Sequence, residues 1–137
     1  MDYAQKLNEL LTTTAKQNAS DLHIAVGRRP TLRIDGTLVP FAKEEIITPE
    51  AAEALIGSLL NPEQKAKLEK DRQVDFAYSF EDKARFRVNA YYQRGYLAAA
   101  LRLIQARIRS SEELGLPPIV HDFAKLSQGF VLVVGPA

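Results

Sequence analysis

The chain has 137 residues, of which 46% are hydrophobic and 26% are charged, a composition typical of one globular domain rather than of a disordered or collagen-like protein. No apolar run approaches the roughly 18 residues of a membrane span, and the polar N-terminus is unlike a signal peptide. The absence of cysteine excludes disulfides, a thiolate nucleophile and a cysteine-ligated zinc. We therefore expect a soluble, non-secreted protein without a structural metal site.

Charge is distributed unevenly, although the net charge is only +1. Residues 83–111 include seven basic residues and no acidic one, whereas residues 41–82 include ten acidic and five basic residues. One part of the fold is therefore expected to face negatively charged groups.

The N-terminal third predicts one helix followed by three strands. Asp2 is a candidate N-cap, and leucines at helical spacing follow it. Residues 21–26 alternate between apolar and polar types, and His23 on the polar side is interpreted as a hydrogen-bonding structural residue. Residues 31–39 repeat the alternation around Asp35-Gly36, which is a strong signal for a two-residue hairpin turn.

Two helices and three more strands are expected next. Thr48-Pro49-Glu50 combines an N-cap, a proline at the first helical position and an acid in the first turn. Asn61-Pro62-Glu63-Gln64 predicts a second helix that begins with a capping box. Alternation then predicts strands over residues 74–80, 84–93 and 96–104. The expected fold class is α/β of the α+β kind, with an antiparallel sheet of about five or six strands and flanking helices.

The predicted hairpin at Arg94-Gly95 carries the most informative chemistry. A two-residue loop there makes the numbers of paired residues sum to 189, whereas a three-residue loop with a glycine bulge would change this register. In the first case Phe86 lies on the apolar face, and Arg87 lies directly opposite Arg102 on the other face. Two such guanidiniums repel each other by some tenths of a kcal/mol, and an anion bound between them would reverse the sign. Two interpretations remain open, a bound phosphate or carboxylate, or solvated arginines with carboxylate neighbours from elsewhere in the fold.

The C-terminal residues have a different character. Residues 114–118 predict a linker, and a short helix near residues 120–126 and an apolar strand at residues 130–134 follow. The strand runs into Gly135-Pro136, as a strand enters the phosphate-binding loop G-x-x-x-x-G-K-[ST]. The motif positions for the second glycine, the lysine and the Ser/Thr would come after position 137. This chain alone is therefore not expected to hydrolyse a nucleotide.

Several short motifs, taken as a set, resemble the N-terminal domain of secretion and pilus-motor ATPases. They are Ala19-Ser20-Asp21-Leu22-His23-Ile24, Arg33-Ile34-Asp35-Gly36, Arg85-Phe86-Arg87-Val88-Asn89, Gln93-Arg94-Gly95, Leu114-Gly115-Leu116-Pro117 and the segment from Gly129 to Pro136. Within that superfamily the chain is most similar to the PilT-type pilus retraction ATPases. The predicted first helix begins close to Met1 without a further N-terminal module, which favours a retraction motor over an assembly motor. Ala137 departs from the family pattern, in which threonine is usual.

The resemblance implies a PAS-like domain over residues 1–113. Residues 114–137 would then be the interdomain linker and the first strand of a truncated RecA-like ATPase domain. The complete protein would be a homo-hexameric motor that uses ATP and Mg²⁺ to retract type IV pili and support twitching motility. It would be cytoplasmic and peripheral to the inner membrane through the pilus machinery. Its partner would be the inner-membrane platform protein. It would not bind nucleic acid, and it would have no direct membrane span. This chain alone should bind no cofactor tightly.

The resemblance also assigns candidate site residues. Arg87 and Arg102 match two family arginines that reach the ATP phosphates, where they would neutralise charge on the transferred phosphoryl oxygens as catalytic groups. Gly135 and Pro136 match the start of the phosphate-binding loop.

Two functions of other classes remain open. One is a nucleic-acid-binding module that uses the basic sheet face, with Tyr91 as a stacking platform. The other is a structural ring-assembly domain whose arginines pair with carboxylates of a neighbouring subunit. Gly135-Pro136 favours the motor, because neither alternative explains it.

Overall fold

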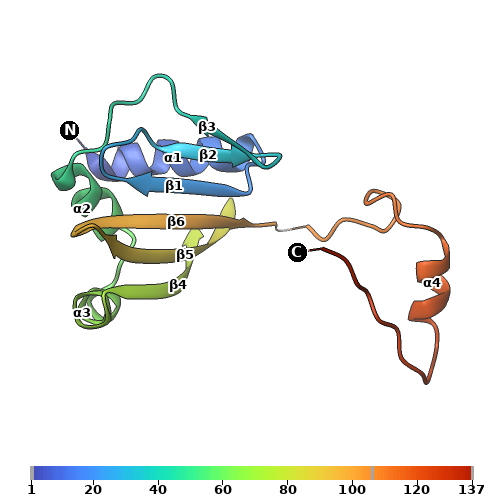
Figure 1. Ribbon diagram of the computed structural model, residues 1–137. Helices are drawn as coiled ribbons and strands as arrows, with labels where there is room; N and C mark the ends of the chain where they lie inside the picture. The colour runs from blue at the N-terminus through green and yellow to red at the C-terminus, as the bar shows by residue number, and fades with distance from the viewer. Residues whose placement is uncertain (1, 106, 137) are drawn as a thin grey trace. The chain divides into compact units, whose positions relative to one another are not determined.

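The computed structural model describes residues 2–105 and 107–136, and it divides into two units that are described separately, Met1–Ala106 and Arg107–Ala137. The first, here called the sheet unit, contains α1 (Tyr3–Lys16), β1 (Asp21–Ala25), β2 (Thr31–Ile34), β3 (Thr37–Pro40), α2 (Pro49–Gly57), α3 (Pro62–Asp71), β4 (Gln73–Phe80), β5 (Ala84–Gln93) and β6 (Tyr96–Ile104) (Figure 1). The second, the C-terminal unit, has α4 (Ile119–Ala124) as the one helix among its described residues. The α+β class predicted from the sequence is confirmed.

The six strands form one antiparallel sheet in the order β3-β2-β1-β6-β5-β4. The strand number agrees with the expected five or six. Figure 1 shows α1 behind the sheet, with no helix of the described part of this unit in front of it. The sheet therefore has a covered face, which packs against helices, and an open face.

Local capping signals explain where the helices begin. The Asp2 Oδ1 atom accepts a hydrogen bond from the Ala4 backbone N–H at 3.0 Å, and the Thr48 hydroxyl oxygen accepts one from Ala51 at 3.2 Å. The predicted capping box is confirmed, because the Asn61 and Gln64 side chains accept from each other's backbone N–H groups at 2.8 and 2.9 Å. These bonds satisfy N–H groups that the first helical turn leaves without partners.

The hydrophobic core lies between the helices and the covered face. Side chains from three strands and α1 are almost wholly buried there: Leu7, Leu10, Leu11, Leu22, Ile24, Phe86, Val88 and Leu101. Burial of each such side chain stabilises the fold by about 1.5–3 kcal/mol relative to its exposure. Strand alternation then requires the intervening residues to lie on the open face.

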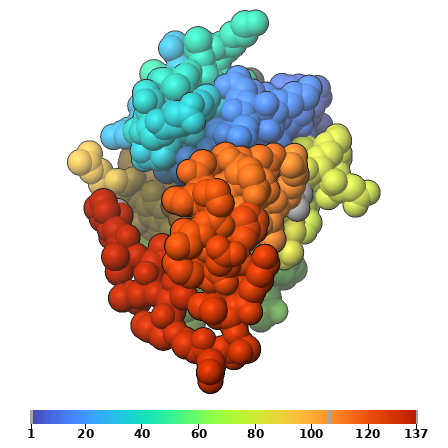
Figure 2. Space-filling view, turned by 90° about the vertical axis from the view of Figure 1, so that its right-hand side faces the viewer, coloured from blue at the N-terminus to red at the C-terminus, as the bar shows by residue number. Residues whose placement is uncertain are grey.

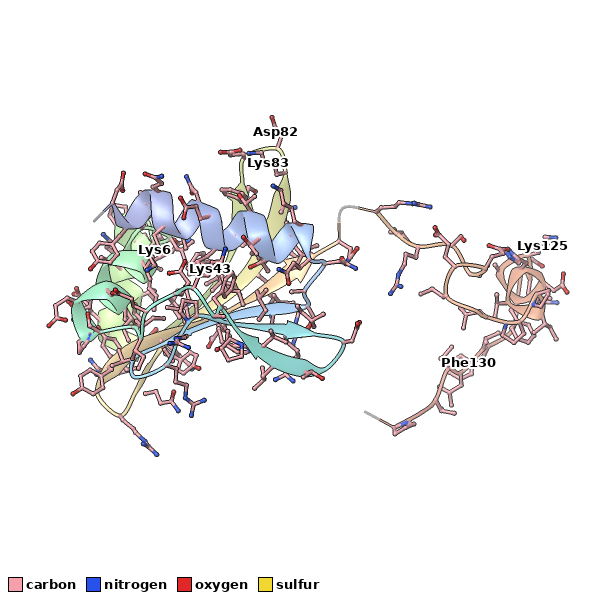
Figure 3. The ribbon with its side chains drawn as sticks, turned by 90° about the horizontal axis from the view of Figure 1, so that it is seen from above. Lys6, Lys43, Asp82, Lys83, Lys125 and Phe130 are labelled. Carbon is pink, nitrogen blue, oxygen red and sulfur yellow. The ribbon has the colours of Figure 1, made fainter. Side chains whose placement is uncertain are left out.

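The C-terminal unit lacks comparable burial among its described residues. The predicted short helix is present as α4, but residues 130–134, predicted as a strand, are extended and pair with no strand in the described part of the chain. Their side chains are exposed, with Phe130 at 86% and Val133 at 94% (Figure 3 labels Phe130). A strand needs a neighbour to satisfy its backbone N–H and C=O groups, and none pairs with it here.

The units divide after residue 106, whereas the linker predicted from the sequence starts at residue 114. The assignment of residues 114–137 to a linker and a second domain stays a prediction. Ala137 lies outside the described residues. In the described part of the chain no helix is long and apolar enough to cross a membrane.

Candidate anion site on the open face of the sheet

The open face gathers most of the chemistry that the sequence singled out. It carries Asp21 and His23 of β1, Arg85, Arg87, Asn89 and Tyr91 of β5, and Ala98, Ala100 and Arg102 of β6. The alanines leave the middle of this face shallow, because their side chains end at Cβ.

The register of the β5–β6 hairpin is the one expected from the sequence. Arg87 pairs with Arg102, and each of the nine pairs in this ladder sums to 189. Arg94 and Gly95 have φ values of 53° and 83°, both in the left-handed region that a two-residue hairpin turn requires. The alternative with a three-residue loop and a glycine bulge is therefore wrong.

Arg102 has a carboxylate partner from a strand that is distant in sequence. Its Nε donates a hydrogen bond to the Oδ1 atom of Asp21 at 3.2 Å, and the two residues are register partners in β1 and β6. Asp21 is only 8% exposed, and its Oδ2 also accepts from the Ser20 hydroxyl at 2.8 Å and lies 3.8 Å from Arg33 Nε. Asp21 is therefore the residue that orients Arg102, a role that no pattern in the sequence indicated.

Arg87 differs from Arg102 in this respect. It is exposed, and it forms no ion pair with any residue that the structure describes. Arg102 therefore has the carboxylate neighbour of the second interpretation, whereas phosphate binding by Arg87 and Arg102 stays a prediction. Two guanidiniums, of which only that of Arg102 has a carboxylate partner, leave an excess of positive charge, and paired charge-assisted hydrogen bonds suit a phosphate at such a place.

His23 does not act as the hydrogen-bonding residue that the sequence suggested. Its Nε2 atom is buried without a hydrogen-bond partner among the described residues. Burial lowers the pKa of His23 below its ordinary value, an effect that Asp21 opposes and Arg33 reinforces. The imidazole is therefore neutral at neutral pH.

The remaining sequence-predicted site residues lie in the other unit. Gly135 and Pro136 belong to the exposed extended segment of the C-terminal unit, whereas the structure brings Arg87 and Arg102 together in the sheet unit. In the described residues no group of three histidine, cysteine or acidic side chains could hold a metal ion. The arginine pair fits a phosphate, and it supplies no ligand for Mg²⁺.

A cluster in the C-terminal unit looks like a catalytic triad but cannot act as one. The Nε2 atom of His121 lies 2.8 Å from the Ser111 hydroxyl and 2.7 Å from a Glu112 carboxylate oxygen. A triad needs the hydroxyl and the carboxylate on different ring nitrogens. Hydrogen bonds from its own backbone, then from His121 and Ser110, lower the pKa of Glu112 to about 2, which fits a surface charge that organises the preceding turn.

Comparisons with known proteins agree with the fold and the motifs. The chain is 35% identical over 135 residues to the type IV pilus retraction ATPase PilT of Pseudomonas aeruginosa, a match that covers 95% of this chain and 38% of that protein. It is 32% identical over 130 residues to the type IV pilus ATPase PilU of the same organism, covering 95% of this chain and 34% of PilU. It thus spans little more than a third of the length of these relatives. No family model matches the chain.

A solved structure of the pilus retraction motor PilT with bound ADP has the same fold. It superposes with a TM-score of 0.72 at 35% identity, covering 82% of this chain and 33% of that one. The ATPase DotB of Legionella pneumophila, at 24% identity and a TM-score of 0.61, shares the fold alone. Sequence and fold together identify this chain as an N-terminal domain of the PilT-type pilus ATPase family.

Proposed function

We propose that this chain is the nucleotide-responsive domain of a hexameric ATPase that retracts type IV pili and so drives twitching motility. Arg87 and Arg102 contact the ATP phosphates at a site that an ATPase domain completes, and Gly135 and Pro136 begin the loop that holds those phosphates. The observation that supports this best is the placement of Arg87 directly opposite Arg102 on a helix-free face, in a chain related to a motor solved with ADP.

The role of each arginine follows from its contacts. Because Asp21 accepts from the Nε atom of Arg102, the terminal nitrogens of that guanidinium remain to donate to a phosphate. Arg87 contributes a guanidinium without a carboxylate partner among the described residues, so its charge is available to the ligand. ATP with Mg²⁺ supplies the phosphoryl group whose transfer drives the motor. The two guanidiniums neutralise charge that develops on that group.

The rest of the assignment belongs to the whole motor. Six copies form a ring in the cytoplasm, attached to the inner membrane through a platform protein of the pilus machinery. Nucleic acid plays no part. The position of this domain changes with the bound nucleotide, because Arg87 and Arg102 bind a phosphate only when it lies against the open face.

The test uses the longer protein in which this chain is followed by its ATPase domain. Arg87→Ala and Arg102→Ala are each expected to lower ATP turnover about 10²-fold or more, since an arginine that stabilises transferred phosphoryl charge is worth at least that much. Arg85→Ala is the matched control, because it removes a guanidinium from the same face of the same strand two positions away. Normal turnover in Arg87→Ala rings would overturn the proposal. It would favour the structural ring-assembly function instead.

A further inference from the structure

A cavity of about 540 Å³ lies on the open face, where the β1–β2 loop and the β5–β6 hairpin border the sheet. In Figure 2 the β5–β6 hairpin (gold) projects toward the left of the view. The arginines and tyrosines that line the cavity, here called the basic pocket, are Arg28, Arg29, Arg33, Arg94, Tyr91 and Tyr96. No aspartate or glutamate is among the described residues that line it.

The basic pocket is separate from the Arg87–Arg102 pair. Neither of those arginines lines it. Tyr91 follows Arg87 by four residues along β5, which corresponds to about 13 Å at the usual strand rise. One small anion therefore cannot occupy both places.

The charge of the pocket is largely uncompensated. Arg33 lies 3.8 Å from Asp21, whereas Arg28, Arg29 and Arg94 take part in no ion pair within the described residues. Guanidiniums gathered around one hollow repel each other, and an anion with several oxygens turns that repulsion into paired charge-assisted hydrogen bonds.

Arg94 occupies its position at a conformational cost. Its φ of 53° precedes Gly95 at 83°, a turn in which asparagine or glycine is favoured at the first position. A residue held in a sparsely populated backbone region at the edge of a cavity points to a role of its side chain there. That side chain is a guanidinium that lines the pocket.

Two further features suit a ring-bearing ligand. Tyr91 and Tyr96 present aromatic surfaces to the cavity, and Tyr96 is 49% exposed. Aromatic side chains stack on nucleobases of any sequence. His23 also lines the cavity, although its unpartnered Nε2 atom is buried.

We propose that the basic pocket binds a free nucleotide, with its phosphates on Arg28, Arg29 and Arg94 and its base against Tyr91 or Tyr96. The volume of the cavity lies within the range of small-molecule sites, about 300–1,000 Å³. An acidic peptide would use the guanidiniums but would not need the stacking surfaces. This site does not depend on the proposed function, because it uses none of the Arg87–Arg102 contacts.

The experiment titrates the 137-residue chain with ATP and follows both binding heat and the ring signals of its two histidines by NMR. Binding is expected to be saturable, weaker than micromolar and weakened by added salt. The signals of His23 should shift while those of His121, which lies in the other unit, stay in place.

Three variants locate the site. Arg28→Ala and Arg94→Asn should each weaken ATP binding about tenfold or more, the loss expected for one charge-assisted contact. Arg94→Asn should also leave the melting temperature unchanged or raise it, because asparagine suits the left-handed turn, so the loss of binding cannot come from unfolding. Arg85→Ala, which removes a guanidinium of the open face outside the pocket, should bind ATP as the parent chain does.

Probe chemistry tests the assignment to a nucleotide. Tripolyphosphate should bind more weakly than ATP, and Tyr96→Ala should weaken ATP binding but not tripolyphosphate binding. Equal affinity for the two probes would overturn the assignment, as would stronger binding of a poly-glutamate peptide or of a single-stranded oligonucleotide. If Arg87→Ala abolished ATP binding and Arg28→Ala had no effect, the ligand would lie at the Arg87–Arg102 pair. That result would overturn the proposal that ATP binds in the basic pocket.

Discussion

The covered and open faces of the sheet are made by the same six strands, yet they differ in almost every physical property. On β5, Phe86, Val88 and Ala90 are fully buried beneath the helices, whereas the residues between them, including Arg87, lie on the open side. The covered face is apolar and supplies the core, and the open face holds two groups of arginines and a neutral histidine. We therefore expect changes on the covered face to alter stability and changes on the open face to alter the proposed ligand binding.

The largest expected effect is on the covered face. Phe86→Ala should reduce the free energy of unfolding by about 3–5 kcal/mol, because it removes a fully buried aromatic ring and leaves a cavity. Urea unfolding measures this change directly. Arg85→Ala, the neighbouring position on the opposite face, should change stability by no more than about 0.5 kcal/mol. Equal losses in the two variants would show that the open face also carries the stability of the sheet.

A smaller effect should separate the two arginines of the candidate phosphate site. Arg102→Ala is expected to destabilise the chain by about 1 kcal/mol, because Asp21 remains buried and loses its hydrogen bond from Arg102, keeping that from Ser20 and the more distant charge of Arg33. The effect is small because the Arg102 side chain is 74% exposed and water screens its ion pair.

Arg87→Ala should be neutral or stabilising by a few tenths of a kcal/mol, because it relieves repulsion with Arg102. Thermal melts of both variants under one set of conditions test the contrast. A lower melting temperature for Arg87→Ala than for Arg102→Ala would mean that Arg87 has a structural partner. The double variant Asp21→Asn with Arg102→Ala is the control. Its loss in the free energy of unfolding should be smaller than the sum of the losses in the two single variants.

The smallest effect is a pH dependence at His23. Burial lowers the pKa of His23, so acidification protonates the unfolded chain before the folded one. Its contribution to stability is therefore present above the ordinary pKa of 6.5 and is lost as the pH falls through the lowered folded value. Melting temperatures between neutral pH and pH about 5 should fall less steeply in His23→Asn than in the parent chain. If the melting temperature of His23→Asn depended on pH as steeply as that of the parent chain, the pKa of His23 would not be lowered in the folded protein.

Local signals in the sequence predicted the helices and strands of the sheet unit. They also predicted the pairing of Arg87 with Arg102 in the candidate site. The capping box at Asn61 and the proline after Thr48 act within one helical turn, so their outcome does not depend on the rest of the molecule. The pairing of Arg87 with Arg102 was predictable for the same reason, because a two-residue turn sets the register of both strands that it joins. The strand predicted at residues 130–134 is absent from the described sheet, since a continuous apolar run cannot by itself supply a partner strand.

The sequence by itself determined which residues share a face of each strand, since side chains alternate with a period of two wherever a strand forms. Only the tertiary structure decided which strands lie side by side. The pairing of β1 with β6 brings Asp21 to Arg102 across 81 residues, and the same pairing joins the β1–β2 loop to the β5–β6 hairpin around the basic pocket. Strand order follows from how the whole set of apolar faces packs against α1 and α2, and no local motif encodes that arrangement.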